Sequence, residues 1–334
     1  MRRVDFESRV PTSWGMHSDA SPRSGRLHHL GVLRFTGPDS VSFLQGQVSN
    51  DTRRLADGQC VLAAYSSPQG RVLALLHLLP HSSGIIAILP KELLAPTMAA
   101  LRKFVLRAKV TIEDTGDGLC VAGAHAVRHL ASAGLTAPSD LGYAETEEIG
   151  VASVHRDPSR YWVIGAAERL AEHGLTGDAD PEKLEHDWRL ADIRAGLPQI
   201  YLATREAFVA QMLNLDVLDG ISFSKGCYTG QEIIARTQHL GRIKRRLYRL
   251  RLPNGEWRIG QSLRLSDGRA GRLVEAIDSG DGVEALAVLN LHATAAEGTE
   301  AESLAARDSA DGDAVTGAAG AAVAAVVLPL PYEL

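Results

Sequence analysis

Apolar runs of strand length, separated by short polar turns, fill the first third of the chain. The segment Ser66-Ser67-Pro68-Gln69-Gly70-Arg71 contains Pro and Gly and separates two such runs, so it predicts a tight β-hairpin. Leucines and alanines at helical spacing predict a helix within 91–106. A short helix is expected to start at Asp39 or Ser40, since either side chain can cap it. The predicted strands are 30–35, 60–65, 72–79, 84–89 and 109–113.

The middle of the chain pairs short β runs with amphipathic helices, over 119–130 and again over 161–173. A longer helix is predicted over 182–195, because Leu184 and Trp188 share one apolar stripe and Gly196 is a suitable stop. This order indicates an α+β fold rather than a doubly wound sheet. Neither a G-x-G-x-x-G nor a G-x-x-x-x-G-K-[ST] motif is present, which argues against dinucleotide enzymes and simple NTPases.

After Arg242 the pattern changes to short β runs divided by Asn-Gly and Asp-Gly turns, which predicts a small C-terminal β-barrel or sandwich. The stretch 293–320 is rich in Ala, Gly and acidic residues, so we expect a mobile loop before a last strand near 323–328. Residues 1–24 lack periodicity and are expected to form a flexible arm.

Composition narrows the function classes only slightly. The chain has 334 residues, 45% of them hydrophobic, and a formal net charge of −5, which is too mild for a surface built wholly for nucleic acid. No apolar segment follows the cationic start, and the apolar stretch near 317–328 is too short to span a bilayer, so we expect a cytoplasmic protein without a membrane contact.

The three cysteines, Cys60, Cys120 and Cys227, are too far apart to suggest a zinc site or a disulfide framework. Cys60 and Cys120 fall in apolar runs and are interpreted as core residues. Cys227 instead lies in a glycine-rich segment, two residues after Lys225 and just before a predicted helix through Arg236. Lysine and the helix start both favour a thiolate, whereas a half-buried loop cysteine with Lys225 paired to a carboxylate is the equally weighted alternative.

The octapeptide Lys225-Gly226-Cys227-Tyr228-Thr229-Gly230-Gln231-Glu232 resembles the signature of the YgfZ family of folate-binding proteins, which are relatives of the glycine-cleavage T-protein. The resemblance extends over roughly 28–334. It includes the first helix and loop at 43–51, Gln69-Gly70-Arg71, the helix end at 188–198, the segment 208–216 and the closing Leu330-Pro331-Tyr332.

This resemblance implies a three-domain ring around a central hole that holds tetrahydrofolate. It implies a first α+β domain (25–50 with 117–205) intertwined with a second (51–116 with 206–241), and a C-terminal β-barrel domain (242–334). The implied role is to support assembly, maintenance or repair of iron–sulfur enzymes, including those that methylthiolate tRNA. Folate and iron–sulfur enzymes or assembly factors are the implied partners.

Carried over by position, Lys225 and Cys227 are the residues on which function depends most. Gly226 and Gly230 shape the turn, and Tyr228, Thr229, Gln231 and Glu232 complete the motif. The resemblance assigns folate binding to Gln45, Gln47, Arg71, Asp192, Arg194, Gln211 and Arg236. For Gln45 and Gln47 the alternative, favoured by residue type alone, is a set of hydrogen bonds within their own loop.

Two departures separate this chain from the aminomethyltransferases. Their Gly-x-x-Asp-Asp arrangement corresponds here to a stretch with Ala74 and Leu75, so their acid–base chemistry has no carboxylate. A Glu that contacts the pterin in many relatives corresponds to Arg194. A guanidinium cannot accept a hydrogen bond, so either the ligand shifts or Asp192 or another acceptor replaces that Glu.

Two further features leave alternatives open. The run 236–251 carries seven Arg or Lys residues, and it is either a patch for the folate tail or RNA, or a solvated strand face at a domain junction. Direct RNA binding is the less favoured of these because no RNA-binding aromatic pattern accompanies it. The histidines at 28, 29, 77 and 81 lack supporting ligands, so we expect structural roles for them and no stably bound metal.

Two functional hypotheses follow: a folate-binding accessory protein with an essential thiol, or a folate-dependent one-carbon transferase with a noncanonical acid–base group. A monomer is expected because no heptad pattern is present. We predict that Cys227→Ala and Lys225→Ala both abolish function and spare stability, since both positions lie in a polar loop.

Overall fold

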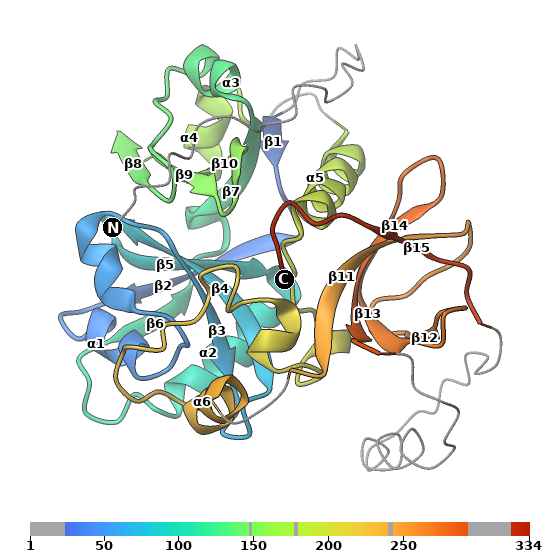
Figure 1. Ribbon diagram of the computed structural model, residues 1–334. Coiled ribbons are helices and arrows are strands. Elements are labelled where there is room, and N and C mark those ends of the chain that lie inside the picture. Colours follow the sequence, from blue (N-terminus) through green and yellow to red (C-terminus); the bar gives the residue numbers. More distant parts are fainter. Residues whose placement is uncertain (1–23, 147–148, 177–179, 240–242, 293–321) are drawn as a thin grey trace, which may run out of the picture.

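The computed structural model describes residues 24–146, 149–176, 180–239, 243–292 and 322–334. Three five-stranded sheets organise these residues, with helices between and around them (Figure 1). The predicted arm (1–24, apart from Ser24) and the whole of the predicted loop 293–320 lie outside the described residues. The mixture of helices and antiparallel sheets confirms the α+β class.

The central sheet has the order β3-β4-β5-β2-β6, and all its pairs are antiparallel. The predicted hairpin is present, because Gly70 adopts φ +71° in the turn between β3 and β4. Nearly every side chain of β3 and β4 is buried, which explains their continuous apolar runs. The strands are β2 (Leu30–Thr36), β3 (Val61–Ser66), β4 (Val72–His81), β5 (Gly84–Pro90) and β6 (Thr111–Asp114).

A second sheet has the order β1-β7-β10-β9-β8. Helices α3 (Val127–Ser132) and α4 (Ala167–Glu172) directly follow β7 and β10, and their Leu130 and Leu170 belong to one core with that sheet. The sequence analysis missed three of the strands. The strands are β1 (Ser24–Arg26), β7 (Cys120–His125), β8 (Tyr143–Thr146), β9 (Ile149–Val154) and β10 (Asp157–Gly165).

The C-terminal sheet has the order β12-β13-β14-β11-β15. The predicted closed barrel is not found within the described residues, since β12 and β15 are opposite edges of an open sheet. Each edge strand has only three residues, and a single parallel bridge between Leu265 and Val323 links the two sides. The strands are β11 (Arg245–Leu252), β12 (Ser262–Arg264), β13 (Ala270–Asp278), β14 (Val283–Asn290) and β15 (Val326–Leu328).

Helix α5 (Pro181–Ala195) contacts both the second sheet, at β1, and the C-terminal sheet, at β13 and β14 (Figure 1). Asp180 caps its start and Gly196, at φ +66°, ends it as predicted. Trp188 is buried against Gly123, where an added Cβ would lie 2.4 Å from the indole. This helix therefore joins two of the three sheets.

The remaining helices are short and lie mostly around the central sheet. The α-helices are α1 (Ser40–Gln45), α2 (Leu94–Arg102) and α6 (Gln231–His239), and the 3-10 helices are η1 (Thr52–Asp57), η2 (Lys91–Leu93), η3 (Gly116–Gly118), η4 (Leu202–Thr204) and η5 (Ala210–Leu213). One strand of the first predicted domain pairs with strands of the second. Strand β2 falls within the range 25–50, but it pairs with β5 and β6, which fall within 51–116.

Candidate functional site

The segment Gly220–Gly230, here named the cysteine loop, leads into α6 and is attached to the loop that follows α1. Ser222 N donates to Ser49 O at 2.9 Å, and Ser49 Oγ donates to Gly220 O at 2.6 Å. Near the other end, Thr229 N donates to Gly46 O at 3.3 Å. The two loops that the sequence places about 175 residues apart therefore form one unit.

Lys225 is buried in this unit rather than solvated. Lys225 is only 5% exposed. Its Nζ donates hydrogen bonds to Val48 O at 2.8 Å and to Asn50 O at 2.7 Å. Nζ also lies 5.0 Å from the centre of the Tyr228 ring, within range of a cation–π contact. Burial lowers the pKa of Lys225 to about 8. This burial contradicts the premise that Lys225 lies in a solvated loop, so we now expect Lys225→Ala to lower stability, because the ammonium holds two loops together.

Cys227 is exposed, whereas Cys60 and Cys120 are buried. Burial raises the pKa of Cys60 to about 12 and also raises that of Cys120, so these two thiols are unreactive core groups, as predicted. The chain thus carries one accessible thiol on an anchored loop.

The two glycines of the motif, Gly226 and Gly230, differ in the space around them. Gly230 has φ +81°, and a Cβ there would lie 2.6 Å from Ser67 O and 3.1 Å from Gly70 Cα. Gly70 in turn faces Ile233 of α6, so the β3–β4 hairpin and the end of the cysteine loop approach through two glycines. Nothing lies within 4 Å of a Cβ placed on Gly226, so its predicted turn-shaping role has no steric basis.

The other motif residues are divided between core and surface. Tyr228 is buried, and burial raises its pKa to about 12. Gln231 and Glu232 form the first turn of α6, as predicted, and Glu232 is exposed there. Thr229 is half-buried.

The residues assigned to folate around the cysteine loop differ in their free hydrogen-bonding capacity. Both ends of the Gln45 amide are engaged, since Nε2 donates to Asp51 and Oε1 accepts from both N and Oγ1 of Thr52. Gln47 Oε1 is buried without a partner. Gln211 is 0% exposed and donates to Ile234 O at 2.7 Å, while its Oε1 is likewise unpartnered.

The two predicted arginines near this loop are placed differently. Arg71 Nη1 donates to Ala207 O at 3.1 Å at the end of the hairpin, and it is half-buried. Arg236 is exposed on α6.

Asp192 and Arg194 on α5 are both committed to ion pairs. Asp192 Oδ1 lies 2.8 Å from Nη2 of Arg160, a side chain 1% exposed that also bonds Asp157. Burial nevertheless raises the pKa of Asp192. Arg194 Nη2 lies 2.8 Å from Oε1 of Glu284 on β14. Each side chain keeps hydrogen-bonding capacity beyond its ion pair, because a carboxylate has two acceptor oxygens and a guanidinium has five N–H donors, so Asp192 as the substitute acceptor stays a prediction.

Sequence reasoning missed a polar contact between the central and second sheets. The rings of His77 on β4 and Trp162 on β10 meet edge to face at 4.6 Å, and Gln199 Nε2 lies 3.4 Å from His77 Nε2. Trp162 Nε1 and Gln199 Oε1 are buried without a partner. Burial lowers the pKa of His77 to about 3, so the ring is neutral. Only the polar His77 inside an otherwise apolar strand signalled this contact.

Two of the seven cations in 236–251 form ion pairs within the described residues, and a third donates to an amide. Arg246 forms an ion pair with Asp216, and Arg249 Nη2 lies 2.6 Å from Glu284 Oε2. Arg245 Nε donates to Asn290 Oδ1 at 2.9 Å. These contacts favour the domain-junction interpretation for the three arginines.

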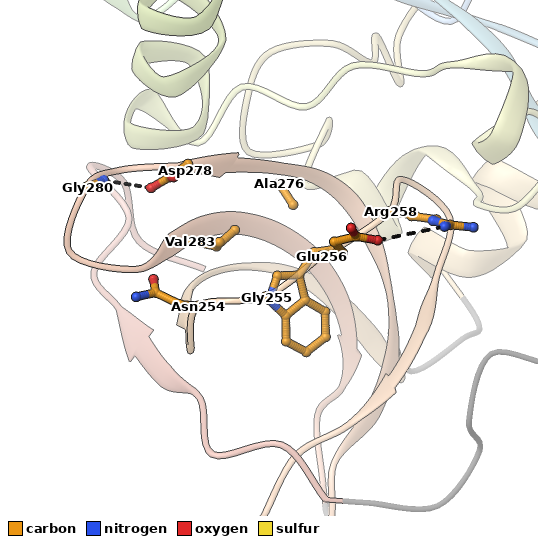
Figure 2. Close-up of a pocket in the computed structure, with 9 residues that line it drawn as sticks. Asn254, Gly255, Glu256, Arg258, Ala276, Asp278, Gly280 and Val283 are labelled. Atoms are coloured by element: carbon orange, nitrogen blue, oxygen red, sulfur yellow. Dashed lines mark hydrogen bonds and ion pairs between the residues drawn. The ribbon is translucent and has the colours of Figure 1, made fainter.

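Two observations concern other kinds of site. Within the described residues, no group of three or more His, Cys, Asp or Glu side chains is arranged to hold a metal ion, and each helix is too short or too polar to traverse a bilayer. A cavity of about 460 Å³ lies on the C-terminal sheet beside Trp257, between the loop at 254–258 and the β13–β14 turn (Figure 2). None of the motif residues lines it.

The comparisons agree with the motif. No family model matches the chain. It is 32% identical over 342 aligned positions to the tRNA-modifying protein YgfZ of Pectobacterium carotovorum, covering 99% of this chain and 97% of that one. It is 34% identical to the protein of the same name from Yersinia pestis strain Pestoides F, covering 79% and 83%.

Among solved structures, the glycine cleavage system aminomethyltransferase T of Bartonella henselae matches with a TM-score of 0.53 at 15% identity, over 80% of this chain and 77% of that one. This likeness shows the fold, and the sequence identity to the two YgfZ proteins shows the family. The chain belongs to the YgfZ family.

Proposed function

We propose that this protein binds tetrahydrofolate and supports assembly, maintenance or repair of iron–sulfur enzymes, including enzymes that methylthiolate tRNA. The observation that carries the proposal is the exposed thiol of Cys227 on a loop held by buried contacts. The name of its relatives, tRNA-modifying protein YgfZ, supports the link to tRNA modification. The aminomethyltransferase fold supports a folate ligand within a three-domain ring.

The cysteine loop suits a thiol that meets a partner. Lys225 fixes the loop from inside through Val48 O and Asn50 O, so Cys227 is presented without needing to order a flexible segment first. A thiolate is the sulfur form that attacks electrophiles and ligates iron. The exposure of Cys227 supports an iron–sulfur cluster of a client enzyme as the proposed substrate of this thiol.

The residues present fit a folate in part. The ring of a pterin carries an amino group and ring N–H donors that require acceptors, and Gln47 Oε1, Gln199 Oε1 and Gln211 Oε1 are buried acceptors with no partner. Trp162 Nε1 is an unpartnered donor. Bound tetrahydrofolate supplies a carrier for one-carbon units.

The alternative is a folate-dependent one-carbon transferase. The positions of the aminomethyltransferase carboxylates hold Ala74 and Leu75, both 0% exposed, so an acid–base group would have to come from elsewhere. Turnover separates the two: purified protein that consumes formaldehyde or an aminomethyl donor with tetrahydrofolate would support the transferase.

The test of the accessory role uses Cys227→Ser in a strain lacking the gene. We expect the variant to fold, to bind tetrahydrofolate as the wild type does, and to fail to restore methylthiolated nucleosides in tRNA. Arg53→Ser is a matched control, because its side chain is 69% exposed and near the same loops, and it should restore function. Full restoration by Cys227→Ser would reject the proposed role of the thiol.

A further inference from the structure

The segment that follows α2 presents large apolar side chains to solvent among cations. Leu106 is 85% exposed and Phe104 is 43% exposed. Arg102, Lys103, Arg107 and Lys109 surround them in sequence and are all exposed. We call these six residues the 102–109 surface. Exposed apolar side chains of this size, grouped and rimmed by charge, are typical of a binding surface.

The backbone of this segment is held in place. Phe104 N donates to Leu101 O at 2.9 Å, and Lys109 N donates to Asp39 Oδ2 at 2.7 Å. Val105 and Ala108 pack against the main core between the exposed residues. Phe104 and Leu106 are therefore directed outward by an anchored turn, so little conformational entropy is lost when a partner covers them.

The surface carries four cations and no acidic residue of its own. The sequence from 101 to 112 contains no acidic residue. Glu113 is ion-paired with Arg34, so Asp39, whose carboxylate accepts the Lys109 amide, is one acid beside four cations. Among the described carboxylates none forms an ion pair with the four cations, while Arg102 donates to Ile112 O. A partner of opposite charge is therefore favoured.

We propose that the 102–109 surface docks a second protein whose own surface has an apolar pocket rimmed by carboxylates. Phe104 and Leu106 would fill the pocket, and Lys103 and Arg107 would meet the rim. An aliphatic Leu at the most exposed position favours a protein over RNA, where bases stack on aromatic rings. Two inserted side chains on a short turn are also too few for stable anchoring to a bilayer. The proposal shares no residue with the folate or thiol sites.

In the first step, a photo-crosslinking amino acid replaces Leu106 in the full chain, which is expressed in its host cells. A parallel experiment places the same amino acid at position 202. Leu202 is 53% exposed on η4 and is the matched control. The protein captured only from position 106 is then purified. Its affinity is measured for wild type, Leu106→Ser, Arg107→Glu and Leu202→Ser, at low and high salt. The tRNA pool and vesicles of equal parts phosphatidylglycerol and phosphatidylcholine are tested alongside.

We expect the captured protein to bind Leu106→Ser and Arg107→Glu at least about tenfold more weakly than wild type. It should bind Leu202→Ser with the affinity of wild type. The affinity for wild type should fall as the salt concentration rises. All variants should bind tetrahydrofolate as the wild type does, so this proposal fails independently of the folate role. Absence of a 106-specific protein adduct overturns the proposal. The proposal is also overturned if the surface binds only tRNA, vesicles or a second copy of the chain, and Leu106→Ser abolishes that binding. The partner is then the one that was bound.

Discussion

At the residue scale, Lys225 and Cys227 are neighbours in sequence but have opposite environments. The sequence analysis treated both as polar loop residues, because glycine and serine surround them. Burial of Lys225 depends on carbonyls contributed by residues 48 and 50, which no local pattern connects to it. The identity of both residues could be predicted from the motif, but their division into an anchor and an exposed group required the fold.

Lys225→Ala should lower the free energy of unfolding by about 2 kcal/mol, because two buried carbonyls lose their donor and the lysine stem leaves a gap. Cys227→Ala, at an exposed position, should change it by less than about 0.5 kcal/mol. Urea unfolding of the two variants and wild type measures the difference. Equal stability of the two variants would contradict the anchoring role of Lys225.

His77 should make stability depend on pH. Its pKa is about 3 in the folded protein and near 6.5 when unfolded, so between these values the unfolded state binds more protons. Stability should therefore fall as pH drops from 6.5 toward 3, with a slope from this residue of at most about 1.4 kcal/mol per pH unit.

His77→Gln removes this proton binding and should flatten the profile. Burial also lowers the pKa of His155, so the difference between wild type and variant isolates the share of His77. Urea midpoints between pH 4.5 and 7.5 give both profiles. Parallel profiles would show that His77 does not titrate on unfolding in this range.

At the element scale, local patterns predicted the elements and long-range pairing decided the sheets. The β3–β4 hairpin and α5 carry their own turn and cap residues, so both were predicted close to their true bounds. Strand β8 is only four residues long and has no fully buried side chain, so no clear alternation marks it. The strand order of the C-terminal sheet does not show the expected barrel, and closure depends on edge pairing that a strand pattern does not contain.

The contact between the hairpin and α6 gives a test of how the motif is positioned. Gly230→Ala places a Cβ 2.6 Å from Ser67 O at a left-handed φ, so we expect a loss of about 2 kcal/mol or more in the free energy of unfolding. Gly226→Ala, four residues earlier, meets nothing within 4 Å and should be nearly neutral. Chemical unfolding of this pair decides whether Gly230 alone sets the turn.

At the scale of the whole molecule, the net charge of −5 says nothing of the ion pairs that connect α5 to the C-terminal sheet. Arg189 on α5 pairs with Glu275 on β13, and Arg194 pairs with Glu284 on β14. The partners are 86 and 90 residues apart in sequence. Charges can be counted from the sequence, but these two pairs depend on how α5 lies against the C-terminal sheet.

Glu284 is the strongest test of that junction. Its side chain is 2% exposed and accepts from both Arg194 and Arg249. Burial alone would raise its pKa, but the hydrogen bonds and charges of the two arginines outweigh this and lower it. Glu284→Gln keeps the shape and leaves two guanidinium groups short of a counter-charge, so we expect a loss of about 3 kcal/mol in the free energy of unfolding.

The matched control is Glu256→Gln, whose side chain is 93% exposed and whose ion pair with Arg258 is 3.9 Å long. It should cost less than about 0.5 kcal/mol. If the junction holds the C-terminal sheet to α5, amide exchange in β13 and β14 should also accelerate in Glu284→Gln, while exchange in β3 and β4 stays slow. Uniform acceleration across all three sheets would instead show that the sheets unfold as one unit, so that Glu284 stabilises the whole molecule rather than the docking of one part.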